Sequence, residues 1–72
     1  MTKFKPGDVI RIKNMDNTRW LWRAMIVLGA RYYDYDLYIL DSKSTQGLNA
    51  AGTVRFWSID QTEKFYELVE DY

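Results

Sequence analysis

Residues 19–41 read RWLWRAMIVLGARYYDYDLYILD and decide the fold, because they form two strand-like runs separated by a glycine. In the second run every other side chain is apolar: Tyr33, Tyr35, Leu37 and Ile39. This period of two is typical of a strand with one face against a core. In the first run both alternating sets contain large apolar side chains. We therefore expect a central antiparallel hairpin with its turn at residues 29–31.

Shorter patterns on both sides extend the hairpin to five strands. We expect strands at residues 9–13, 19–28, 32–40, 53–59 and 66–69. A turn at residues 4–8 precedes the first strand, and residues 41–52 have no periodicity and form a loop. Asp60 and Glu63 have the spacing of a capping box, which predicts one short helical turn before the last strand. The sequence thus predicts an all-β, strongly bent, five-stranded antiparallel barrel.

The core has to be built from large side chains, because a chain of 72 residues buries only about 60% of the surface that its unfolded form exposes. Three Trp, six Tyr and three Phe make this possible. We expect a single domain, residues 1–72. Its predicted core consists of Ile10, Ile12, Ile26, Leu37, Ile39, Val54, Phe56 and Leu68.

The composition argues against enzymes and metal proteins. The chain has no Cys and no His, which removes disulfides, thiolate ligands and the commonest general base. Asp34 and Asp36 share a strand face about 7 Å apart, a spacing that glycosidase pairs also show. We interpret them as a solvated strand face, and we expect no catalysis, no cofactor and no metal. Since no apolar run is long enough for a signal peptide or a membrane span, we expect a cytoplasmic protein.

Two short motifs resemble those of a known family. FKPGDVI, residues 4–10, resembles the F-x-x-G-D-x-V opening of SH3-like, Tudor-like and KOW-type barrels. FYELV, residues 65–69, resembles the closing strand of small phage-encoded accessory proteins with that shape. As architecture the resemblance covers the whole chain. It implies an SH3-like domain that acts as a binding module, and it leaves the partner open.

The charges are balanced in number but not along the chain. Residues 1–33 contain seven basic and two acidic side chains, whereas residues 34–72 contain three basic and eight acidic ones. A net charge of zero argues against a protein that coats nucleic acid. Because neighbouring strands of a small barrel bring the two halves together, we interpret the imbalance mainly as cross-strand charge pairing.

Two binding functions remain. The first is a protein-binding module, of the kind with which a phage accessory protein inhibits or redirects a host enzyme of replication or transcription. Its expected interface consists of Trp20, Trp22, Tyr32, Trp57, Asp60, Glu63, Glu67, Glu70 and Asp71. The acidic members suit a host protein with a basic surface.

The alternative is a small nucleic-acid-binding domain, since cations interleaved with aromatic rings grip phosphates and stack bases. Its expected residues are Arg19, Arg23, Arg31 and Tyr33. An aromatic cage for methylated Lys or Arg would use similar side chains, although no spacing singles one out. The oligomeric state stays open.

Overall fold

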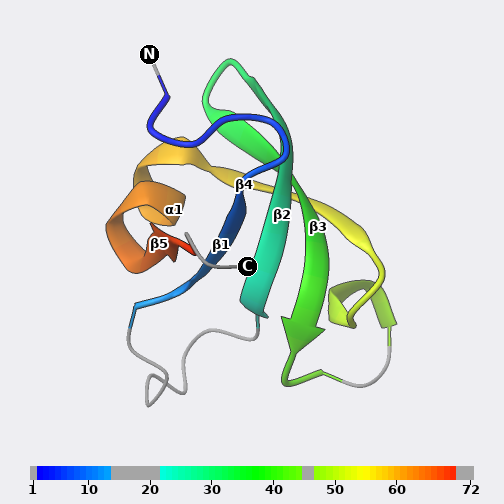
Figure 1. Cartoon of the computed structure of the whole chain (residues 1–72). Coiled ribbons are helices and arrows are strands. Elements are labelled where there is room, and N and C mark those ends of the chain that lie inside the picture. The colour runs from blue at the N-terminus through cyan, green and yellow to red at the C-terminus, as the bar shows by residue number, and fades with distance from the viewer. Residues whose placement is uncertain (1, 14–21, 45–46, 70–72) are drawn as a thin grey trace.

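A computed structural model describes residues 2–13, 22–44 and 47–69 of the chain. The strands are β1 (Val9–Ile12), β2 (Trp22–Arg31), β3 (Asp34–Ser42), β4 (Val54–Ser58) and β5 (Tyr66–Leu68), with α1 (Ile59–Phe65) before β5 and a short 3₁₀ turn, η1 (Gly47–Asn49), before β4. They form one antiparallel sheet in the order β4-β3-β2-β1-β5 (Figure 1). The predicted all-β fold, with five antiparallel strands and one short helix before the last, is confirmed.

The sheet is rolled up, so that its two edge strands approach each other. Trp57 of β4 and Tyr66 of β5 meet edge to face, with their ring centroids 5.6 Å apart. Trp22 at the start of β2 contacts the same indole of Trp57 at 5.5 Å. The enclosed core consists of Phe4, Ile10, Ile12, Met25, Val27, Tyr35, Leu37, Ile39 and Tyr66. Four of the predicted core residues are confirmed: Ile10, Ile12, Leu37 and Ile39.

The predicted hairpin turn at residues 29–31 is wrong. Strand β2 continues to Arg31, which pairs with Asp34, and the turn is formed by Tyr32 and Tyr33. Tyr32 has a φ of 50°, the positive value that tight hairpin turns require. Gly29 instead marks an irregularity in the β2–β3 register, between Val27 and Gly29. The turn therefore carries two aromatic side chains rather than a glycine.

Four predicted core residues do not belong to the core. Ile26 is half-buried, and Val54, Phe56 and Leu68 are exposed. In β2 the opposite set faces inward, through Met25 and Val27, and because both sets are apolar the period alone could not choose between them. In β4 the contacts of Trp57 with Trp22 and Tyr66 turn the other set outward.

The helix begins two residues earlier than the capping pattern predicts. The N-cap is Ser58, whose hydroxyl accepts a hydrogen bond from the backbone N–H of Gln61 at 3.3 Å. Asp60 lies in the first turn of α1. Glu63 is bound to the N-terminal segment instead of to the start of the helix.

A buried tyrosine ties three segments together. The hydroxyl of Tyr35 donates to Oε2 of Glu63 at 2.6 Å and accepts from the backbone N–H of Phe4 at 3.1 Å. The same carboxylate oxygen accepts from the backbone N–H of Lys3 at 2.8 Å. Burial and the contact with Glu63 raise the pKa of Tyr35, and the bonds from Tyr35 and Lys3 lower the pKa of Glu63. This network holds α1 and the N-terminal segment against β3.

Candidate functional site

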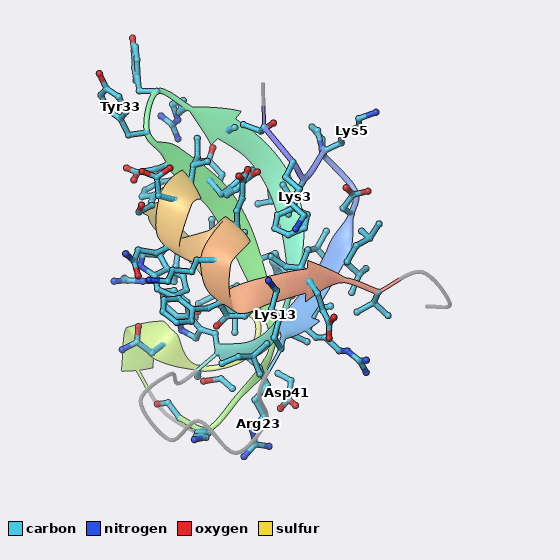
Figure 2. The ribbon with its side chains drawn as sticks, turned by 90° about the vertical axis from the view of Figure 1, so that its left-hand side faces the viewer. Lys3, Lys5, Lys13, Arg23, Tyr33 and Asp41 are labelled. Carbon is cyan, nitrogen blue, oxygen red and sulfur yellow. The ribbon has the colours of Figure 1, made fainter. Side chains whose placement is uncertain are left out.

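The β2–β3 turn presents two tyrosine side chains to solvent. Tyr32 is 93% exposed and Tyr33 is 85% exposed, the two highest values among the large hydrophobic side chains of residues 2–13, 22–44 and 47–69. Figure 2 shows Tyr33 projecting from the upper end of the molecule. We call residues 31–34 the tyrosine tip. Exposed aromatic side chains at the end of a rigid hairpin are suited to binding a partner.

The tip is a ridge between two open hollows. The first, about 300 Å³ in volume, is lined by Thr2, Tyr32, Tyr33, Ser58, Ile59 and Asp60. The second, about 270 Å³, is lined by Arg31, Tyr32, Tyr33, Asp34, Asp36 and Phe56. Both tyrosines line both hollows. A partner that covers the tip can therefore place one side chain on each side of the ridge.

Backbone pairing holds the walls of these hollows in place. The N–H of Ile59 donates to the carbonyl of Tyr33 at 2.8 Å, which fixes the start of α1 beside the turn. Asp34 is paired with Ser58, and Asp36 with Phe56, across the β3–β4 ladder. Residues that are distant in the sequence thus line the hollows on rigid elements, which limits the entropy lost on binding.

The hollows are mainly acidic. Their linings contain three carboxylates, on Asp34, Asp36 and Asp60, and one cation, Arg31. Arg31 already has partners: its Nη2 lies 3.2 Å from Oδ2 of Asp36, and its guanidinium lies 5.1 Å from the ring centroid of Phe56. Asp34 and Asp60 are exposed and make no ion pair within the part of the chain that the structure describes. The charge left for a partner is negative.

This combination of groups fits a cationic side chain. An ammonium or guanidinium group is attracted to an aromatic face within about 6 Å of its centre. A nearby carboxylate adds a charge-assisted hydrogen bond. Tyr32 or Tyr33 would supply the aromatic face, and Asp34 or Asp60 the carboxylate. A phosphate group at the same place would meet negative charge.

The structure unites only part of the predicted protein-binding set. Tyr32 and Asp60 line the same hollow. Trp22 and Trp57 are half-buried and pack against the core. The remaining members are placed elsewhere: Glu63 bonds to Tyr35 and Lys3, Glu67 lies 3.4 Å from Arg11, and Trp20, Glu70 and Asp71 fall outside the described residues.

Only two of the predicted nucleic-acid-binding residues are brought together. Arg31 and Tyr33 belong to the tip, whereas Arg23 lies eight residues earlier on β2, about 25 Å away at the rise of a strand. There its Nη1 is 3.9 Å from Oδ2 of Asp41. Figure 2 shows Arg23 and Asp41 at the opposite end of the molecule from Tyr33. Arg19 is outside the described residues.

Sequence reasoning missed several residues of the two hollows. The strand pattern assigns Phe56 to the core, and Asp34 and Asp36 to a solvated strand face. Thr2, Ser58 and Ile59 carried no signal, because their role depends on the packing of α1 beside the turn. The pair Tyr32–Tyr33 next to Asp34 was the one local hint.

No protein-family model, curated protein or solved structure matches this chain. The resemblance to SH3-like barrels therefore stays a prediction. Within residues 2–13, 22–44 and 47–69, no three acidic side chains are grouped so that they could hold a metal ion. In those residues no helix has the length and apolar character needed to cross a membrane.

Proposed function

We propose that this chain is a non-enzymatic protein-binding module that uses the tyrosine tip to bind a basic segment of a partner protein. The observation that carries the proposal is the tip itself: two highly exposed tyrosines between two hollows whose unpaired charges are negative. Tyrosine is enriched among the residues that dominate binding energy at protein interfaces. Lysine or arginine side chains of the partner would enter the hollows.

A basic partner agrees with the acidic interface residues, such as Asp60, that the sequence predicts. A basic surface on a host enzyme, such as a surface that itself binds DNA, offers the cations that the tip accepts. A phage accessory protein that covers such a surface would inhibit or redirect the enzyme. The absence of His and Cys from the chain supports a role in binding rather than in catalysis.

Nucleic-acid binding is the less favoured function. Its support is the presence of Arg31 and Tyr33 together at the tip. However, Arg31 is engaged by Asp36 and Phe56, and three carboxylates surround the tyrosines. Phosphate contacts provide most of the affinity for nucleic acid, and they require free cations.

The test compares two probes on the same protein: a short peptide of alternating lysine and glycine, and a single-stranded oligonucleotide. Amide shifts in two-dimensional NMR would report binding at each residue. We expect the basic peptide to shift residues 31–34 and 58–60, more strongly at low salt. Shifts at the tip with the oligonucleotide alone would contradict the proposal.

Matched variants locate the interaction. Tyr32→Ala combined with Tyr33→Ala should weaken peptide binding about tenfold or more, as loss of a dominant interface residue does. Tyr38→Ala is the control, because Tyr38 is an exposed tyrosine that lines neither hollow. Asp34→Asn combined with Asp60→Asn should weaken binding and flatten its salt dependence.

A further inference from the structure

One edge of the sheet has little protection against pairing with another strand. Strand β4 has the sequence VRFWS, in which Arg55 is the one charged residue and there is no Lys, Pro or acidic residue. Val54 is 51% exposed and Phe56 is 59% exposed on its outer face. Soluble proteins commonly block edge strands with charge, proline or very short length. The other edge, β5, has only three residues, and its Glu67 forms an ion pair with Arg11.

The β4 backbone also has groups that point away from the sheet. The N–H of Ile39 donates to the carbonyl of Thr53 at 2.9 Å, and the N–H of Ile59 donates to the carbonyl of Tyr33 at 2.8 Å. Bonded pairs in an antiparallel ladder recur every second residue. The odd-numbered residues of β4 therefore face β3, and Val54 and Phe56 direct their N–H and C=O groups to the open edge.

An apolar row crosses the outer face and ends at this edge. Val9 pairs with Ile26, Ile26 with Tyr38, and Tyr38 with Val54, so four strands contribute one apolar side chain each. Val9 and Ile26 are half-buried, and Tyr38 and Val54 are exposed. The row ends at Val54, and Phe56 lies on the same face of β4. A strand added next to β4 would gain backbone hydrogen bonds and apolar contact with Phe56.

We propose that a second copy of this chain occupies the edge, with the two β4 strands paired antiparallel about a two-fold axis at Phe56. In this register Phe56 lies opposite Phe56 of the second copy, and Val54 lies opposite Ser58. On the other face Arg55 lies beside Trp57 of the second copy, an arrangement that allows cation–π attraction. Phe56 meets its counterpart on the axis, and every other contact is made twice, as a two-fold interface requires.

Repulsion between like charges favours the register centred on Phe56 over the adjacent register centred on Arg55. A shift that centres the axis on Arg55 places two arginines directly opposite each other, which is unfavourable in a β-ladder. The Phe56-centred register places no like charges opposite each other within β4. The net charge of the chain is zero, so no overall repulsion opposes the approach of two copies.

The dimer has a geometric consequence. Ser58 lines the first hollow and pairs with Asp34, so the tyrosine tip lies at the Ser58 end of β4. Antiparallel pairing directs the two Ser58 ends in opposite directions. The dimer would therefore present two tips, one at each end of the paired strands. Phe56 also lines the second hollow, so the paired strands border that hollow in each copy, whichever partner the tip binds.

The test is sedimentation of the full chain from about 10 μM to about 1 mM, the range in which small interfaces associate. The native chain should shift from monomer to dimer. Phe56→Lys and Phe56→Glu should each raise the dissociation constant about tenfold or more, because like charges then face each other across the axis. An equimolar mixture of the two variants should dimerise again, since Lys then faces Glu.

Leu68→Lys is the control, because Leu68 is exposed to a similar degree on the opposite edge strand, and it should dimerise like the native chain. Hydrogen exchange adds a backbone readout: the amide of Phe56 should become protected on dimerisation. A native chain that stays monomeric over the whole range would overturn the proposal. So would a Phe56→Lys variant that dimerises normally, or a variant mixture that stays monomeric.

Discussion

Two pairs of tyrosines occupy opposite environments in this chain. Tyr35 and Tyr66 are buried, and their hydroxyls donate to Glu63 and to the carbonyl of Trp22. Tyr32 and Tyr33 are almost fully exposed, although Tyr33 is only two residues from Tyr35. The difference comes from the position of the turn, which removes Tyr33 from the strand alternation. The buried pair stabilises the barrel, and we propose that the exposed pair binds.

The largest effect should come from the buried pair. Replacing Tyr35 by Ala empties a fully buried site. It also removes a ring whose centroid lies 5.8 Å from that of the Phe4 ring. We expect a loss of about 3–5 kcal/mol in the free energy of unfolding, measured by urea titration. Ile39→Ala, also fully buried, should lose about 2–5 kcal/mol. A loss below about 0.5 kcal/mol at either site would contradict the inward orientation of that face of β3.

A smaller effect should follow from removing one hydroxyl. Tyr66→Phe keeps the ring against Trp57 but removes the donor to the carbonyl of Trp22. We expect a loss of about 1 kcal/mol, the typical value of one hydrogen bond, in the same titration. A value as large as that of Tyr35→Ala would mean that the bond, rather than the ring, closes the barrel.

The third effect depends on pH. The folded chain lowers the pKa of Glu63, so the ionised carboxylate contributes stability above its ordinary value of about 4.5. That contribution is lost as the pH falls through the folded pKa. We expect the melting temperature of the native chain to fall with acidification below pH 4.5, and Glu63→Gln to fall less steeply. Identical slopes for the two chains would show that Glu63 is not the responsible group.

Tyr35 acts at the opposite end of the pH scale. Its pKa is raised above 10.0, so folding favours the neutral phenol, and this contribution is lost as the pH rises beyond that value. Tyr35→Phe should make the alkaline limb of the stability curve shallower. In thermal melts, the melting temperature of the native chain should fall more steeply with rising pH than that of the variant. An unchanged limb would contradict the assignment.

The smallest effect on stability should come from the exposed pair. Tyr32→Ala combined with Tyr33→Ala should change the free energy of unfolding by no more than about 0.5 kcal/mol, because neither ring belongs to the core. The same variant should lose peptide binding. A large loss of stability would show that the tip supports the barrel, and the contrast between the two tyrosine pairs would disappear.

The alternation of apolar and polar side chains predicted the orientation of a strand where only one of its two faces is apolar. The alternation in β3 correctly placed Leu37 and Ile39 inside, because its outward positions are mostly polar. In β2 and β4 both faces carry apolar side chains, so the choice depends on distant contacts, such as that of Trp57 with Trp22. The hollows beside the tip could not be predicted, because Asp60 and Tyr33 line the same hollow only after α1 folds against the turn.

The positive φ of Tyr32 allows the proposed binding role to be compared with stability at a single position. Glycine adopts such a conformation freely and asparagine more readily than most residues, whereas a bulky side chain is strained there. A library randomised at position 32 and sorted for thermal resistance alone should therefore enrich glycine and asparagine. The same library sorted for capture of the basic peptide should return tyrosine. The difference between the residues enriched in the two libraries would show whether the proposed binding role and stability favour different side chains at position 32.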